Sequence, residues 1–240
     1  MSLSDPLVLV PGLMCDAAVW EPLYPHLPAG TNCLVADHGE ADSLTVMAQR
    51  LLDQAPARFA LAGHSMGARV ALEVARLAPQ RVQRLALLDT GFKPLAAGEA
   101  GQQEVAKRQA LLQTARAQGV RAMATEWVKG MVHPARLDDA ALIEDILRMF
   151  ERKTADIFAA QIHALIHRPD ATGVLQSLAM PTLIACGRQD SWANVAQHEA
   201  MHALAPDSVM EIVEDAGHMA PMERPREFAA MMARWLSRAQ

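Results

Sequence analysis

Short runs of consecutive apolar residues alternate along this chain with stretches in which apolar residues recur every three or four positions. A short continuous apolar run is typical of a strand covered on both faces, and the three-to-four spacing is typical of an amphipathic helix. The runs predict strands at residues 7–10, 33–36, 59–62, 85–88, 182–186 and 209–213, and the spacing predicts helices at 16–20, 43–52, 68–78, 193–205 and 225–238. Such alternation predicts an α/β fold with a doubly wound, mainly parallel sheet of six strands.

The strand pattern is interrupted between Phe92 and Ser177. Apolar spacing there predicts helices at 105–118, 120–129, 137–151 and 155–167, with Gly119, His133-Pro134 and Arg168-Pro169 between them. We interpret this region as a helical cap, inserted after the fourth core strand and lying over the carboxyl edge of the sheet. The core domain then comprises residues 1–91 and 178–240, and the cap comprises residues 92–177.

The segment Gly63-His64-Ser65-Met66-Gly67 lies between an expected strand and an expected helix. A serine between two glycines at such a switch is the pattern of a nucleophile elbow. The serine backbone is strained there, and the close approach of strand and helix leaves no room for side chains at the glycine positions. The alternative interpretation is an ordinary serine in a tight turn. We favour a nucleophile at the carboxyl edge of the sheet.

A serine nucleophile needs a base, and the base needs a carboxylate that orients it. Asp190 follows the fifth expected strand and His218 follows the sixth, so both are expected at the same sheet edge as Ser65. We therefore predict a catalytic triad of Ser65, His218 and Asp190. Two alternatives stay open: Asp190 is also placed to cap the helix after it, and Asp89, after the fourth strand, is the second candidate for the orienting acid.

With this order of serine, acid and histidine, the chain resembles the α/β-hydrolase family over nearly its whole length. It is most similar to small bacterial carboxylesterases and lactonases with a helical cap. The resemblance implies an oxyanion hole made by the backbone N–H groups of Leu13 and Met66. The sequence departs from the family pattern at Pro11, where a histidine is common. It also leaves no room before Leu7 for the family's two leading strands, so a six-stranded core is expected.

The resemblance implies a cofactor-free serine hydrolase that cleaves a small, largely apolar ester, lactone or related acyl compound through an acyl-enzyme. Two other functions stay open at this point. One is a ligand-binding or sensor protein on a hydrolase scaffold, because a fold does not determine a function. The other is a carbon–carbon hydrolase or lyase that uses the same triad. Substrate identity is expected to depend on the cap, where Met123, Trp127, Met131 and Phe150 are candidate pocket residues.

A second motif, His198-Glu199-Ala200-Met201-His202, matches the H-E-x-x-H signature of zinc proteases. We interpret it as a helix surface, with Ala200, Met201 and Leu204 as the buried stripe and both histidines turned toward solvent. Glu223 is the conceivable third ligand, but it falls beside the loop of His218. We therefore expect no metal and no cofactor.

Composition narrows the expected partners. The formal net charge is −5 and the basic residues are scattered, which argues against a nucleic-acid surface. No apolar run approaches the roughly 20 residues of a membrane span. Three cysteines (Cys15, Cys33 and Cys186) and the absence of a secretory signal favour free thiols and a cytoplasmic protein. The expected partner is a small acyl substrate, without nucleic acid or membrane.

Overall fold

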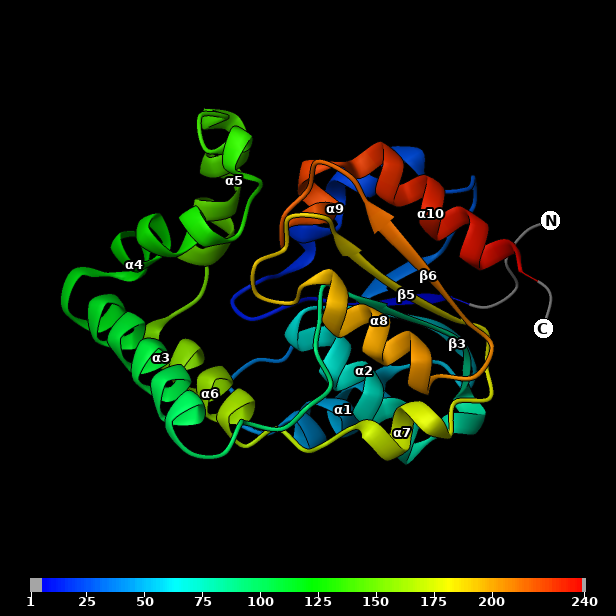
Figure 1. Ribbon diagram of the computed structural model, residues 1–240. Coiled ribbons are helices and arrows are strands. Elements are labelled where there is room, and N and C mark those ends of the chain that lie inside the picture. The colour runs from blue at the N-terminus through cyan, green and yellow to red at the C-terminus, as the bar shows by residue number, and fades with distance from the viewer. Residues whose placement is uncertain (1–5, 239–240) are drawn as a thin grey trace.

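The computed structural model describes residues 6–238 and contains one sheet of six strands (Figure 1). The strands are β1 (Leu7–Val10), β2 (Cys33–Val35), β3 (Phe59–His64), β4 (Val82–Leu88), β5 (Thr182–Gly187) and β6 (Ser208–Val213). Their order is β2-β1-β3-β4-β5-β6, and every neighbouring pair is parallel. The prediction of a doubly wound parallel sheet with six strands is confirmed.

Helices cover both faces of the sheet because each carries one apolar stripe. The helices α1 (Leu44–Gln54), α2 (Met66–Leu77) and α8 (Val195–Leu204) lie on one face, and the 3₁₀ helix η2 (Glu21–His26), α9 (Ala220–Glu223) and α10 (Pro225–Ser237) lie on the other (Figure 1). In α2, for example, Val70, Ala71 and Val74 are fully buried against the strands. The central strands β1, β3 and β4 are therefore enclosed by apolar side chains, and their carboxyl ends are held firmly.

The region between β4 and β5 is helical, as its sequence predicts. It contains α3 (Glu99–Gln118), α4 (Val120–Trp127), α5 (Ala140–Glu151), α6 (Ala155–Ile166) and α7 (Thr172–Gln176), with short 3₁₀ helices at Val128–Gly130 and Pro134–Arg136. Figure 1 shows α3 to α6 grouped to one side of the sheet, whereas α7 packs with α2 and α8. The division of the chain at residues 92 and 177 stays a prediction.

The observed boundaries differ most from the predicted ones at α3. This helix begins at Glu99, before the predicted start at residue 105. Its first turns are mostly exposed and carry no apolar stripe, so the spacing of apolar residues does not predict them. The predicted helix at 43–52 is α1, which begins one residue later, and the side chain of the preceding Ser43 makes no capping hydrogen bond.

All three cysteines are free thiols, and two of them, Cys15 and Cys186, are buried. Within residues 6–238, no helix is both long and apolar enough to cross a lipid bilayer.

Candidate active site

The strand β3 ends in a turn that leads directly into α2, and Ser65 lies at this switch. Its φ of 55° and ψ of −119° place a non-glycine residue in a strained conformation. The Ser65 N–H donates to the Leu88 carbonyl at 2.8 Å, and the Thr90 hydroxyl donates to the Ser65 carbonyl at 2.9 Å. Both groups of the strained peptide are thus held by the end of the neighbouring strand β4.

Two glycines allow strand and helix to approach this closely. A Cβ atom at Gly63 would lie 2.4 Å from the Gly67 carbonyl oxygen, and a Cβ at Gly67 would lie 2.1 Å from the Val10 carbonyl oxygen. Both contacts are with backbone, which has no freedom to move aside. The spacing of the two glycines therefore follows from the packing of α2 against β1 and β3.

We expect Gly67→Ala to lower the free energy of unfolding by about 3 kcal/mol or more, because the new methyl group must displace backbone in the centre of the sheet. Chemical denaturation measures this loss. Gly173→Ala in α7 is the matched control: no atom lies within 4 Å of its Cβ position, so the variant should be as stable as the parent or slightly more so. Equal stability of the two variants would contradict the packing argument.

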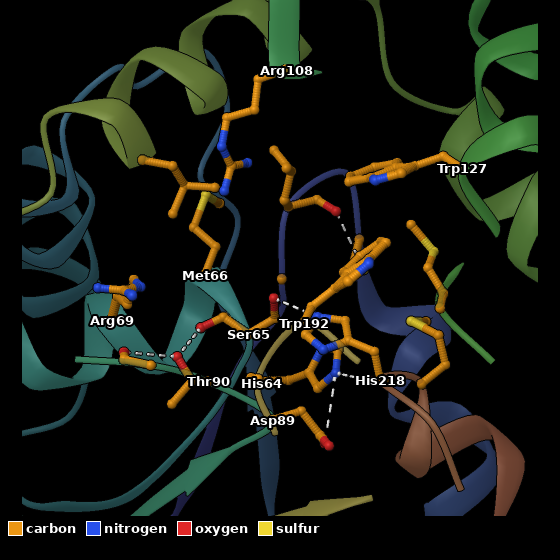
Figure 2. A pocket seen from close by; sticks show the side chains of 18 of the residues that line it. His64, Ser65, Met66, Arg69, Asp89, Thr90, Arg108, Trp127, Trp192 and His218 are labelled. Atoms are coloured by element: carbon orange, nitrogen blue, oxygen red, sulfur yellow. Dashed lines mark hydrogen bonds and ion pairs between the residues drawn. The ribbon is translucent and has the colours of Figure 1, made fainter. Parts of the chain in front are cut away.

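The structure brings Ser65, His218 and Asp190 together, and Figure 2 shows Ser65 and His218. Ser65 Oγ lies 2.8 Å from His218 Nε2, and His218 Nδ1 lies 2.8 Å from Asp190 Oδ2. The other Asp190 oxygen, Oδ1, accepts hydrogen bonds of 2.9 Å from the N–H groups of Trp192 and Ala193. Burial raises the pKa of Asp190, but the charge and hydrogen bond of His218 and these two N–H groups outweigh burial and lower it. Asp190 is therefore ionised beside the imidazole.

The backbone of His218 is fixed from both sides. Its N–H donates to the Met131 carbonyl at 2.6 Å, and its own carbonyl lies 2.8 Å from Nε2 of His64. Burial, followed by the charge of His218, lowers the pKa of His64 to about 3, so His64 is neutral and donates this hydrogen bond. The hydrogen-bonded series Ser65–His218–Asp190 is called the relay. The His64 side chain packs beside this relay and positions the His218 loop.

Asp89 does not contact the imidazole of His218 in the described structure. Its Oδ1 accepts the Gly187 N–H at 2.9 Å, so it bridges the ends of β4 and β5 instead of bonding its own turn. Its Oδ2 lies 3.9 Å from His64 Nε2 and has no hydrogen-bond partner among residues 6–238. Burial, reinforced by the charge of Asp190, raises the pKa of Asp89 well above its usual value. This approach is therefore between two neutral groups.

The loop after β1 lies directly against the serine. A Cβ at Gly12 would be 3.1 Å from Ser65 Cβ, and the following residue, Leu13, lines the same cavity as Met66. Met66 is the first residue of α2, and a helix offers no acceptor for the N–H groups of its first turn. These positions suit a pair of N–H donors close to Ser65.

Gln161 of α6 is hydrogen-bonded to this loop, and the sequence pattern did not predict this contact. Its side-chain Oε1 accepts the Met14 N–H at 2.8 Å, and both residues are buried. Met14 has a φ of 63°, so the loop is fixed in an uncommon conformation. The available signal was a glutamine within the apolar stripe of a predicted helix, since Phe158, Ile162 and Leu165 are buried with it.

The prediction that His198 faces solvent is wrong. His198 is fully buried, whereas Ala200 is exposed and Leu204 is only partly buried. Nε2 of His198 accepts the Thr90 N–H at 3.1 Å, and Nδ1 lies 3.0 Å from the Asn194 carbonyl. The Thr90 N–H at the end of β4 needs an acceptor, and this requirement turns α8 so that the histidine lies inside.

The rest of the H-E-x-x-H motif is not assembled around His198. His202 is exposed, and its Nδ1 contacts Ser208 Oγ at 2.7 Å. The Glu223 carboxylate accepts the Gly217 N–H at 2.9 Å and the His133 N–H at 2.7 Å. Across residues 6–238, no three His, Cys, Asp or Glu side chains are grouped as metal ligands would be.

A cavity of about 370 Å³ opens above Ser65, between the strand ends and α3 to α6. One side is apolar, with Trp127 stacked on Trp192 at a ring separation of 5.5 Å and Phe150 and Phe158 behind. Of the candidate pocket residues, Trp127, Met131 and Phe150 line the cavity, but Met123 is buried elsewhere in the core. The volume suits a small organic ligand.

Residues 7–231 match the sequence model of the alpha/beta hydrolase family. The chain is 29% identical to the pimeloyl-[acyl-carrier protein] methyl ester esterase of Photobacterium profundum, over 92% of this chain and 91% of that protein. It is 31% identical to the dihydrolipoyllysine-residue acetyltransferase component of the acetoin cleaving system of Pseudomonas putida, over 96% of this chain. The match spans only 63% of the length of that Pseudomonas protein.

Solved structures of an esterase and a lactonase are also similar to this chain. The chain superimposes on a thermophilic esterase from Thermogutta terrifontis with a TM-score of 0.84 and 25% identity, over 98% of this chain and 90% of that one. An enol-lactonase from Burkholderia xenovorans LB400 gives a TM-score of 0.83 at 19% identity, over 98% of this chain and 92% of that one, a likeness of fold alone.

Proposed function

The chain belongs to the alpha/beta hydrolase family, and from this premise we propose that it is a serine hydrolase that cleaves small esters, lactones or related acyl compounds. Ester-bond hydrolysis is the general activity that its esterase relatives support. The observation that carries the proposal is the continuous relay at the cavity floor, with 2.8 Å from Ser65 Oγ to His218 Nε2 and 2.8 Å from His218 Nδ1 to Asp190 Oδ2.

In the proposed reaction, Ser65 Oγ attacks the acyl carbon while His218 Nε2 takes the hydroxyl proton. The Asp190 carboxylate accepts the Nδ1–H, which keeps Nε2 free of a proton until the attack and stabilises the imidazolium afterwards. The N–H groups of Leu13 and Met66 hold the developing oxyanion. Loss of one such donor typically costs about 3–4 kcal/mol of transition-state stabilisation.

The imidazolium then gives its proton to the leaving oxygen, and the alcohol departs from the acyl-enzyme. Water attacks the acyl carbon, with His218 as the base, and Ser65 Oγ leaves with that proton. The acid product is released and the serine is restored. Each of these proton transfers passes through His218 Nε2, and water is the second substrate.

We further propose that residues 92–177 form a cap over this site. In support, α4, α5 and α6 supply Trp127, Phe150 and Phe158 to the cavity wall. Gln161 of the same region holds the oxyanion loop through Met14. These contacts give the inserted helices a part in both substrate selection and the positioning of Leu13.

A hydrolysis screen over acyl chain lengths, lactones and thioesters tests the proposed function, with Ser65→Ala as the blank. Turnover of at least one ester class that disappears in the blank is the expected result. Binding of these compounds without any turnover by the parent protein would favour a sensor instead.

A chelator should leave hydrolysis unchanged, because both nitrogens of His198 are occupied by backbone groups of Thr90 and Asn194. The measurement is the rate before and after dialysis against EDTA, with added Zn²⁺ as the second arm. Loss of activity that Zn²⁺ restores would contradict our interpretation of the motif.

A further inference from the structure

The cavity has a basic wall opposite its aromatic wall. Arg69 of α2, and Lys107 and Arg108 of α3, line it together with Glu104. Figure 2 shows Arg69 and Arg108 on the Met66 side of Ser65, whereas Trp127 and Trp192 lie toward His218. A ligand that spans the nucleophile therefore meets two different environments.

The positive charge of the basic wall exceeds the negative charge beside it. Glu104 is shared: Arg108 Nη2 donates to its carboxylate at 2.9 Å, and Arg168, behind the wall, donates two further bonds of 2.7 and 2.8 Å. Neither Arg69 nor Lys107 has a carboxylate oxygen within 4 Å among residues 6–238, although Glu104 interacts with Arg69 at longer range. One carboxylate therefore faces several cationic side chains.

Within the basic wall, the guanidinium group of Arg69 lies close to that of a second arginine, Arg168. Arg69 Nη1 donates to the Lys93 carbonyl at 3.0 Å, which also accepts Arg168 Nε at 3.2 Å, so the two guanidinium groups converge on one oxygen. Burial, and then the charge of Arg168, lower the pKa of Arg69 to about 9, so it remains protonated at neutral pH. Arg69 is partly buried. The one carboxylate that interacts with it, Glu104, is already bound by Arg108 and Arg168, so a further anion would be favourable there.

We propose that the basic wall of Arg69, Lys107 and Arg108 is a subsite for an anionic group, carboxylate or phosphate, of the ester substrate. Guanidinium groups bind the oxygens of both groups through paired N–H donors. The apolar part of the substrate then lies against Trp127 and Trp192, with the reacting carbonyl over Ser65 between the two walls. This inference rests on the proposed hydrolysis at Ser65 and narrows its substrate class to anionic esters.

The test compares matched esters of one chain length that end in a carboxylate, a phosphate or an uncharged primary amide. For the parent protein, kcat/KM is expected to be at least about tenfold higher for one or both anionic esters than for the amide. The carboxylate and phosphate arms distinguish the two sources of charge. Because Lys107 is exposed, this preference should weaken as ionic strength rises.

Arg69→Gln and Arg108→Gln should each lower the anionic-to-neutral ratio of kcat/KM by up to about tenfold, toward a ratio of one. Arg69→Lys keeps the charge without the paired donors and should give an intermediate ratio. Arg116→Gln is the matched control, because Arg116 lies on α3 with a side chain 58% exposed and outside the cavity. It should keep the ratio of the parent, and circular dichroism confirms that each variant is folded.

Calorimetry of the binding of these esters to Ser65→Ala tests the anion subsite independently of hydrolysis. Tighter binding of the anionic ester than of the amide, lost when Arg69→Gln is added, supports the subsite whatever the turnover. Equal binding and equal kcat/KM for all three esters would overturn the subsite while leaving a serine hydrolase. Absence of Ser65-dependent turnover for every ester would overturn the proposed function and the assignment of the anion to an ester.

Discussion

Ser65→Ala is expected to lower kcat for ester hydrolysis by roughly 10⁴- to 10⁶-fold, because triad members act as a unit and the loss of one removes the whole relay. The Ser65 side chain contacts His218 Nε2, whereas the elbow is held through the Ser65 backbone, whose N–H donates to the Leu88 carbonyl and whose carbonyl accepts the Thr90 hydroxyl. The fold should therefore survive the substitution. Steady-state kinetics on the purified variant gives the rate, and circular dichroism checks the fold.

Two controls make this result interpretable. Ser177→Ala changes an exposed serine whose hydroxyl donates to the Val174 carbonyl at 2.9 Å, and this variant should keep the parental rate. Mass spectrometry after reaction with an organophosphonate should find the covalent adduct on Ser65. Near-parental turnover by Ser65→Ala, or an adduct on another residue, would remove Ser65 from the mechanism.

Asp190→Asn is expected to lower kcat by up to about 10⁴-fold. Asp190 Oδ1 accepts the N–H groups of Trp192 and Ala193, so the oxygen of an asparagine must stay on that side. The new NH₂ group then faces His218 Nδ1, 2.8 Å from the present Oδ2. Nδ1 must accept this N–H, so the proton moves to Nε2 and the imidazole has no lone pair for Ser65.

Asp89→Asn is the matched control for this experiment, and we expect a loss of less than about tenfold. The asparagine oxygen keeps the bond from the Gly187 N–H, and asparagine tolerates the φ of 48° at this position. Because burial already favours the uncharged acid at Asp89, the neutral amide changes little. A large loss with Asp89→Asn and a small one with Asp190→Asn, both folded, would assign the orienting role to Asp89.

The sheet and the positions at its edge were predictable because their signals are local. Continuous apolar runs predicted all six strands, and Gly63 and Gly67 flank a serine whose backbone conformation needs the space they leave. Asp190 and His218 could be placed at the same edge because parallel strands end together.

The missed features depend on contacts between distant segments. His198 is buried where its Nε2 accepts the Thr90 N–H, in the loop after β4, and the spacing of its own helix gives no sign of that contact. Gln161 bonds Met14 across a large sequence separation. Arg69 and Arg108 are ordinary surface-type residues in their own helices, and only the tertiary fold brings α2 and α3 to the same cavity.

During synthesis, the inserted helices delay the addition of β5 and β6 to the sheet strands that precede them in the chain. β4 and β5 are neighbours, with Leu85 paired to Thr182, yet the whole of residues 92–177 is synthesised between them. Pairing over such a separation closes a long loop and is slow compared with local contacts. Ribosomal synthesis delivers Ser65 early and Asp190 and His218 last. Under the proposed mechanism the nascent chain therefore carries the serine without its base, and we expect hydrolysis to begin only when β5 and β6 have joined the sheet.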